Sequence, residues 1–299
     1  MPRFDVLCVG RACVDEILEV AEFPDEDTKV PALTRLREGG GQASTAACLI
    51  SHLGGRAAFV GRIGADAPGA FARRRMAAFG VDLSLLPPPQ GVTPAATCLV
   101  SRRNASRTIV YEKLSATPLT WDELEPALGA GPRAVLVDPQ AEALLPELLR
   151  ACRDRGTLLV ADAERAGAGW EHTWGQVDVL AASHGFLRQA APGLEPAAAL
   201  AAIDRHGPGW SCVTLGERGC LVRIDGATHA LPALAVPVRD TTGAGDAFHG
   251  ALALALARGR DPLAAARYAT AVASLCCRGL GGRSFPDPEE LKQALAPGA

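Results

Sequence analysis

The sequence predicts an α/β protein in which a central, mostly parallel sheet is covered by helices on both faces and carries a smaller β-sheet. Two observations support this. Short apolar segments of β-type composition alternate with helical patterns along most of the 299 residues. Two stretches, residues 12–38 and 92–113, break this rhythm with patterns typical of exposed strands. We therefore expect one domain over residues 1–299, with these two stretches forming a lid over the ligand cleft.

The expected core strands are short apolar runs, several of which end in glycine or a carboxylate. They lie at residues 6–10, 57–61, 134–138, 157–162, 177–180 and 211–215. Helical patterns lie between most of them, at residues 43–53, 67–79, 141–154 and 197–205. After residue 240 the pattern is purely helical, over residues 243–258, 262–277 and 287–295. Because open α/β sheets bind ligands at the carboxyl ends of their strands, we expect the functional site there.

The second lid stretch contains a predicted hairpin. TCLVS is followed by RRNAS and then by RTIVY, which places Asn104 near the tip of a turn between two strands. The run from Pro87 to Pro89 predicts a stiff connection into this hairpin. Exposed strand edges favour pairing, so we expect a homodimer in which two lids form a clasp and Asp27 reaches the neighbouring cleft.

Composition and charge exclude several classes of protein. Hydrophobic residues make up 48% of the chain and charged residues 21%, which is ordinary for a globular protein with a substantial core. The net charge of −3 and the absence of lysine- and arginine-rich runs argue against nucleic-acid or anionic-membrane partners. The nine cysteines form no C-x-x-C pair, and no signal-peptide pattern opens the chain. These features predict reduced thiols and a cytoplasmic protein.

Familiar catalytic motifs are also missing. The dipeptide GK does not occur, which excludes a P-loop. The segment GAGDAF lacks the third glycine of a dinucleotide-binding fingerprint, and neither a G-x-S-x-G elbow nor an H-E-x-x-H pair is present. Dehydrogenase, hydrolase and zinc-protease functions are therefore disfavoured.

The strongest functional signal is DTTGAGDAFHGALALALA, at residues 240–257. Gly243, Ala244 and Gly245 form a turn at a predicted helix start, where free N–H groups and the helix dipole create a seat for an anion. Asp246 places a carboxylate beside that seat, and helix capping does not need it. Phosphoryl transfer to a hydroxyl needs both features, since N–H groups neutralise the transferring group while a carboxylate orients the alcohol and accepts its proton.

A second glycine-rich helix start is EGGGQASTAACLISHLG, at residues 38–54. Its three glycines would let a ligand approach the backbone closely. A plain turn before a tightly packed helix of small residues accounts for the same pattern. The stretch alone leaves both interpretations open.

Together, DTTGAGDAF and GGGQASTAACLISHLGGRAAFVGRIGAD resemble the two signatures of the ribokinase-like, pfkB-type carbohydrate kinases. The resemblance runs from Asp15 to SFPD at residues 284–287, which is nearly the whole chain. It implies a ribokinase-like three-layer sandwich with about nine core strands, a small β lid, and ATP with Mg²⁺ as phosphoryl donor.

The resemblance also implies roles for single residues. Asp246 matches the catalytic base and the turn at 243–245 the anion hole, while Asp15, expected at the end of the first strand, matches the aspartate that holds sugar hydroxyls. The matching nucleotide-binding positions are Thr214, Gly216, Gly219 and Thr270. Asp240 and Thr242 match positions that hold a monovalent cation, such as K⁺, in some members.

Departures from the family pattern bear on the substrate. Gly41 and Ser44 stand where many members have asparagines in GGNAxN, so Gly40, Gly41 and Ser44 are expected to line the substrate site without amide contacts. The N-x-x-E element that helps to organise magnesium is replaced by residues 183–186, SHGF. GGRSFPD is similar to the sulfofructose kinase branch, while RTIV and FPDEDTK are similar to ketohexokinase.

Two basic residues are candidates for binding anionic groups. Lys29 could meet a phosphate or sulfonate on the substrate, although a solvated surface charge is the simpler interpretation. Arg107, in the lid hairpin, could contact either ATP phosphates or the substrate.

The sequence thus favours an ATP-dependent kinase acting on a small sugar, with a ketose or ketose derivative ahead of other sugars. A nucleoside kinase of the same fold is the nearest alternative. A sugar-sensing protein that kept the cleft but lost turnover is a further alternative, which the missing N-x-x-E element leaves open.

Overall fold

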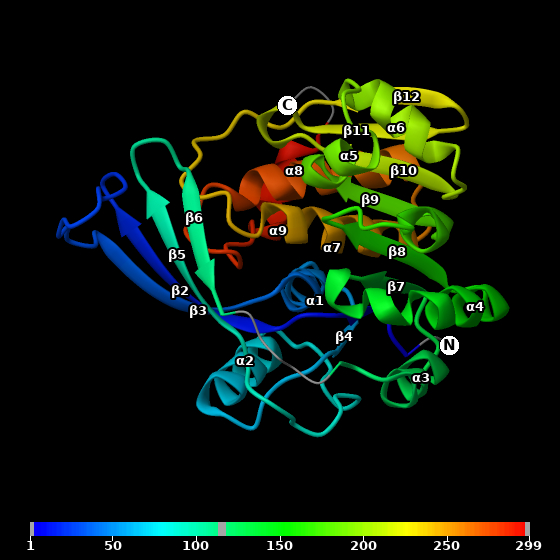
Figure 1. The fold of residues 1–299 in the computed structure, drawn as a ribbon, viewed down its shortest axis with the longest axis horizontal. Helices are drawn as coiled ribbons and strands as arrows, with labels where there is room; N and C mark the ends of the chain where they lie inside the picture. The colour runs from blue at the N-terminus through cyan, green and yellow to red at the C-terminus, as the bar shows by residue number, and fades with distance from the viewer. Residues whose placement is uncertain (1–2, 113–117, 297–299) are drawn as a thin grey trace.

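The chain forms two sheets of unequal size, with helices packed around the larger one (Figure 1). The structure is a computed structural model that describes residues 3–112 and 118–296. Among these residues the larger sheet has eight strands in the order β12-β11-β10-β9-β8-β7-β1-β4. Their bounds are Val6–Val9 (β1), Ala57–Val60 (β4), Ala134–Val137 (β7), Leu158–Ala163 (β8), Val179–Ser183 (β9), Trp210–Thr214 (β10), Cys220–Ile224 (β11) and Ala227–Leu231 (β12). The mostly parallel α/β sheet predicted from the sequence is confirmed.

One edge of this sheet is antiparallel, which the sequence analysis missed. β11 pairs antiparallel with β10 and β12 with β11, whereas β10 through β4 are parallel. The two edge strands are joined by Asp225 and Gly226, both with positive φ (49° and 76°). A two-residue Asp-Gly turn of this kind is a strong hairpin signal, because its twist matches that of the strands it connects. The signal was present, but the mixed polar composition of both strands obscured it.

Helices cover both faces of the large sheet and give three layers. One face is packed by α1 (Gln42–His52), α7 (Ala244–Ala257), α8 (Pro262–Cys276) and α9 (Pro288–Ala294). The other is packed by α3 (Trp121–Gly129), α4 (Leu145–Arg155), α5 (His184–Ala190) and α6 (Pro196–Asp204). Alternate strand residues point into the two cores: Val6 and Cys8 into the first, Leu7 and Val9 into the second. The helix expected at 141–154 begins instead with a 3₁₀ turn at Pro139–Leu144, and α3 and α5 were not expected.

The smaller sheet is built from the two stretches that the sequence assigned to a lid, and it projects from the main body (Figure 1). Its strands are β2 (Cys13–Val20), β3 (Thr34–Gly40), β5 (Ala95–Ser101) and β6 (Arg107–Tyr111), in the order β3-β2-β5-β6. Ile17, Cys98 and Val100 form its small core. The predicted hairpin lies at β5–β6, with Asn104 in the connecting turn, where it accepts hydrogen bonds from Ser106. Lys113, the last residue of the expected lid, lies outside the described residues.

Asp15 is placed differently from the expectation. The first strand ends at Val9, and Asp15 lies on the lid strand β2 instead of at the end of a core strand. Gly10 separates the two segments with φ 151° and lets the chain turn out of the core into the lid. α2 (Ala67–Ala78) packs against β2 and β3 and supports this junction. Within residues 3–112 and 118–296, no helix combines the length and apolar character needed to cross a bilayer.

Candidate active site

The glycine-rich turn at 243–245 opens helix α7, as the sequence predicted. Gly243 is the N-cap, with φ 73°, and a Cβ there would lie 2.5 Å from the backbone of Gly282. The helix begins at Ala244, so Asp246 lies in its first turn. A Cβ at Gly245 would meet no atom within 4 Å. The space beside Gly245 at this helix start is therefore open, while the N–H of Ala244 donates to the carbonyl oxygen of Thr241 at 3.3 Å.

Asp240 holds the segment that leads into this turn in place by hydrogen bonds. One of its carboxylate oxygens accepts hydrogen bonds from the backbone N–H and the hydroxyl of Thr242, at 2.8 and 2.7 Å. The other accepts from the N–H of Gly281, at 2.8 Å. Asp240 is only 1% exposed, and it ties the turn to the loop that follows α8. This observed role is structural, and the role of Asp240 and Thr242 as K⁺ ligands stays a prediction.

A pocket of about 990 Å³ lies beside the start of α7, between the lid hairpin and the main body. Its lining includes seven of the residues singled out from the sequence: Arg107, Thr214, Gly216, Gly219, Ala244, Gly245 and Thr270. Apolar side chains, including Leu234, Val236 and Phe248, form part of the wall. Arg107 reaches across from the lid to the hydroxyl of Thr241. An apolar wall with basic groups and free N–H groups at one end suits a nucleotide, with its base on the wall and its phosphates at the helix start.

Asp246 is half-buried and surrounded by other carboxylates. Its pKa is raised to about 8, mainly by burial and then by the charge of Asp162, with smaller contributions from Asp138 and Asp15. His249 acts in the opposite direction. The predicted base and the predicted sugar-binding Asp15 are therefore close enough to interact electrostatically. A carboxyl group whose pKa lies near neutrality is suited to general-base chemistry.

Two of these carboxylates lie at strand ends. Asp138 follows β7 and accepts hydrogen bonds from the N–H groups of Arg11 (2.7 Å), Ala43 (3.1 Å) and Gln140 (2.8 Å). Burial raises the pKa of Asp138 to about 6, in spite of these bonds. Asp162, near the end of β8, accepts a hydrogen bond from Gln42 at 3.3 Å. These contacts fix the start of α1 against the carboxyl ends of the core strands.

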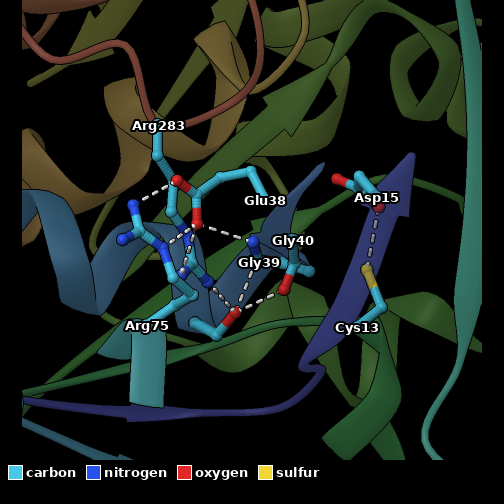
Figure 2. A network of polar contacts seen from close by, with 9 residues as sticks. Cys13, Asp15, Glu38, Gly39, Gly40, Arg75 and Arg283 are labelled. Atoms are coloured by element: carbon cyan, nitrogen blue, oxygen red, sulfur yellow. Dashed lines mark hydrogen bonds and ion pairs between the residues drawn. The ribbon is translucent and has the colours of Figure 1, made fainter. Parts of the chain in front are cut away.

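At the other glycine-rich turn, residues 39–41, protein atoms occupy the space that side chains would need, as Figure 2 shows for Gly39 and Gly40. A Cβ at Gly40 would overlap the carboxylate of Asp15, and one at Gly39 would overlap the guanidinium of Arg283. Gly41 has φ 93°, and a Cβ there would lie 2.5 Å from the carbonyl oxygen of Arg11. Glycine is needed here because neighbouring groups occupy the space of a side chain.

A buried ionic network holds this turn in place (Figure 2). Glu38 accepts two hydrogen bonds from Arg75, at 2.6 and 2.5 Å, and one from the N–H of Gly39 at 2.7 Å. Arg283 donates to the hydroxyl of Ser44 at 3.0 Å, and that hydroxyl donates to the carbonyl of Gly40 at 2.5 Å. The Arg283 side chain is 1% exposed. Ser44 is fully buried, so its observed role is to fix Gly40 rather than to present a hydroxyl to the cleft.

The same network bears on Asp15, whose carboxylate accepts a contact from the Cys13 thiol at 3.3 Å. Burial raises the pKa of Asp15, while Cys13 and Arg283 counteract part of that rise. The positive charge of Arg283 thus favours an ionised Asp15, the form that accepts hydrogen bonds from sugar hydroxyls.

Asp27 and Lys29 lie apart from these groups. Both are exposed, in the connection between β2 and β3 at the outer end of the lid. Asp27 has φ 59°, a conformation that aspartate tolerates in turns. Within this chain the structure does not bring them to the residues around Asp246, so their roles as substrate contacts stay predictions.

Comparison with known proteins agrees with this geometry. The family model described as "pfkB family carbohydrate kinase" matches residues 3–289. The chain belongs to the pfkB family of carbohydrate kinases. It is therefore a phosphotransferase with an alcohol group as acceptor, as the two signatures predicted. The family match also supports the use of ATP as the phosphoryl donor.

Several relatives are similar over nearly their whole length. Mouse ketohexokinase is 28% identical, over 94% of this chain and 98% of its own. A nucleoside kinase from Methanothermobacter thermautotrophicus is also 28% identical, over 96% and 94%. The solved structure of a putative ribokinase from Agrobacterium tumefaciens is 30% identical, with a TM-score of 0.87 over 97% of both chains. Arabidopsis thaliana ribokinase, solved with ribose and ATP, shares the fold at 23% identity, with a TM-score of 0.79 over 98% of both chains.

The described residues fit ATP better than they fit a protein-built magnesium site. The pocket at α7 has the size and lining for a nucleotide, as described above. At residues 183–186 the Ser183 hydroxyl caps α5 by accepting from the N–H of Phe186, and the position of the missing glutamate holds Phe186. No group of three or more metal-binding side chains occurs in the described part of the chain.

Four polar residues of this site were not found by sequence reasoning: Asp138, Asp162, His249 and Arg283. Two of them carried a signal, since Asp138 and Asp162 fall at the ends of predicted strands, where ligand sites are expected. His249 follows Asp246 by three residues on one helix, a spacing that places both on one side. Arg283 lies in a loop 239 residues from its partner Ser44, and no local pattern indicates that contact.

Proposed function

We propose that the protein transfers the γ-phosphoryl group of ATP to a hydroxyl of a ketose or ketose derivative, with Asp246 as the base. The observation that carries this proposal is the position of Asp246. It lies in the first turn of α7, next to the open space beside Gly245, and within electrostatic range of Asp15. A sugar held by Asp15 and a phosphoryl group held at the helix start would meet beside the Asp246 carboxylate.

The reaction follows from these contacts. Asp246 orients the acceptor hydroxyl and accepts its proton, while the hydroxyl oxygen forms a bond to the γ-phosphorus and the bond to the leaving oxygen of ADP breaks. The N–H groups at 243–245 stabilise the charge on the transferring group. Arg107 closes over the pocket from the lid, and its contact to Thr241 places it beside this turn. Proton transfer is late in a loose transition state, so positioning by Asp246 matters as much as its basicity.

Similarity to ketohexokinase over nearly the whole chain supports a ketose as acceptor. The equally similar nucleoside kinase makes a nucleoside the second candidate. ADP release measured across ketoses, their phosphates and sulfonates, and nucleosides separates the two. We expect turnover with a fructose-like sugar and none with adenosine, and the opposite pattern would overturn the ketose assignment.

Asp246→Asn tests the base. The amide keeps the shape of the side chain but cannot accept the proton, so we expect kcat to fall by about 10²- to 10⁴-fold with sugar and ATP binding retained. Calorimetric binding of both ligands is the control for a folded site. Unchanged turnover in this variant would refute the assigned role.

We further propose a homodimer through the lid. β6 lies at the edge of the small sheet, and all five of its residues are exposed. Ile109, Val110 and Tyr111 add apolar surface, with Val110 66% exposed. An exposed apolar edge strand favours pairing with another strand. Light scattering at micromolar concentration tests this: we expect the mass of a dimer, and Val110→Lys should shift it towards the 31.0 kDa monomer.

A further inference from the structure

A buried histidine–aspartate pair lies one helical turn behind Asp246. His249 is on the same side of α7 as Asp246, and its Nδ1 is 3.1 Å from Oδ2 of Asp162. The two residues are 4% and 5% exposed. Within the described part of the chain neither ring nitrogen of His249 has an aligned hydrogen-bond partner, and the contact with Asp162 is an ion pair when the ring is protonated. Burying polar groups without hydrogen bonds costs free energy, and pairing of opposite charges offsets this cost.

The charges around Asp246 indicate a role for this pair. The groups whose charges act on it are Asp162 on β8, Asp138 after β7, Asp15 on β2 and His249 on α7 itself. α1 contributes the uncharged side chain of Gln42, which binds Asp162. Three carboxylates thus raise the pKa of Asp246, and His249 is the group among these four that lowers it. Like charges gathered at one site disfavour the ionised form of each.

We propose that His249 is a positioning residue for phosphoryl transfer: its imidazolium, held by Asp162, offsets part of the negative charge around Asp246 and favours the ionised form of Asp246, which accepts the hydroxyl proton. This inference rests on the proposed role of Asp246 as the base. His249 acts through Asp246 and not by direct contact with the substrate.

Shifts in pKa agree with the geometry. Burial alone would lower the pKa of His249, but the nearby Asp162 and Asp246 carboxylates outweigh it and raise the pKa. His249 in turn lowers the pKa of Asp246, which is about 8 with the histidine in place. Because the base acts as a carboxylate, kcat/KM should fall as the pH falls below this value. Without the imidazolium the same decline should begin at higher pH.

Two variants separate charge from shape. His249→Asn removes the positive charge of the pair, so that nothing in the pair opposes the carboxylates that act on Asp246. We expect the acid limb of the kcat/KM profile to move up by about one pH unit, which lowers activity about tenfold on that limb and much less on the alkaline plateau. In the double variant Asp162→Asn/His249→Asn the pair is neutral again. We expect the limb to return towards its original position.

The double variant makes the test decisive, since a packing role for His249 predicts further loss when Asp162 is also replaced. A second measurement is made on the wild-type protein. Spectra of the protein with ¹³C-labelled histidine should show a protonated imidazole at pH 7, and the absence of this resonance in His249→Asn assigns it to His249. A neutral ring at pH 7, or an unmoved acid limb, would overturn the inference. If Asp246→Asn is fully active, the proposed base fails as well; if it is inactive and the limb does not move, only the inference about His249 fails.

Discussion

The two glycine-rich turns of this protein look alike in sequence but use their glycines for opposite purposes. At residues 39–41 each missing side chain is replaced by protein: Arg283 at Gly39, Asp15 at Gly40 and the Arg11 carbonyl at Gly41. At residues 243–245 the first glycine is required by close packing on Gly282, whereas the space beside Gly245 is empty. A glycine-rich helix start therefore indicates that other atoms come close to the backbone. Only the surrounding structure shows whether those atoms belong to a ligand or to the protein.

Gly41→Ala should have the largest effect on stability and would break the first turn. The new methyl group would press on the Arg11 carbonyl, and alanine tolerates a φ of 93° poorly. We expect a loss of about 2 kcal/mol or more in the free energy of unfolding, measured by urea denaturation.

Gly54→Ala is the matched control for this change. Gly54 also has positive φ (72°), but a Cβ there meets nothing within 4 Å. Backbone strain alone should cost about 1 kcal/mol. Equal losses in the two variants would mean that the packing of the first turn is not what requires its glycine.

Arg283→Gln should have the next largest effect, because it removes the guanidinium packed against Gly39 and Ser44. We expect the free energy of unfolding to fall by about 1–3 kcal/mol because buried contacts are broken. Loss of the positive charge should also favour protonation of Asp15, so KM for the sugar should rise more than KM for ATP.

Arg35→Gln is the control for this change. It removes a surface ion pair to Glu16 from a side chain that is 73% exposed, and it should change the free energy of unfolding by less than about 0.5 kcal/mol. Similar losses in the two variants would contradict a supporting role for Arg283.

Gly245→Ala should have the smallest effect and would sharpen the contrast. No protein atom opposes the new methyl group, so the melting temperature should stay unchanged. The methyl group would instead crowd a phosphoryl group at the helix start, and we expect kcat to fall by about tenfold. Steady-state kinetics and thermal denaturation check the two halves of this prediction. A lower melting temperature with unchanged kcat would show that the second turn resembles the first.

Most of the fold and part of the site could be predicted from local patterns. The parallel core, the lid hairpin at β5–β6 and the helix starting beside Gly243 follow from apolar runs, turn residues and glycine placement. β11 and β12 were missed because their mixed composition hides the alternation that marks a strand, although Asp225-Gly226 signalled the turn between them. Asp15 was assigned to the wrong strand because the change from core to lid depends on the conformation of Gly10.

The sequence by itself determined the class of chemistry, because the anion seat and Asp246 are neighbours along one chain segment and need no distant contact to be recognised. Only the tertiary structure decided which charges surround that acid. Asp162, Asp138 and Asp15 come from three different strands or strand ends, and Arg283 reaches Ser44 from across the chain. Electrostatic interaction depends on distance through space and on burial, and neither can be read from separation along the sequence.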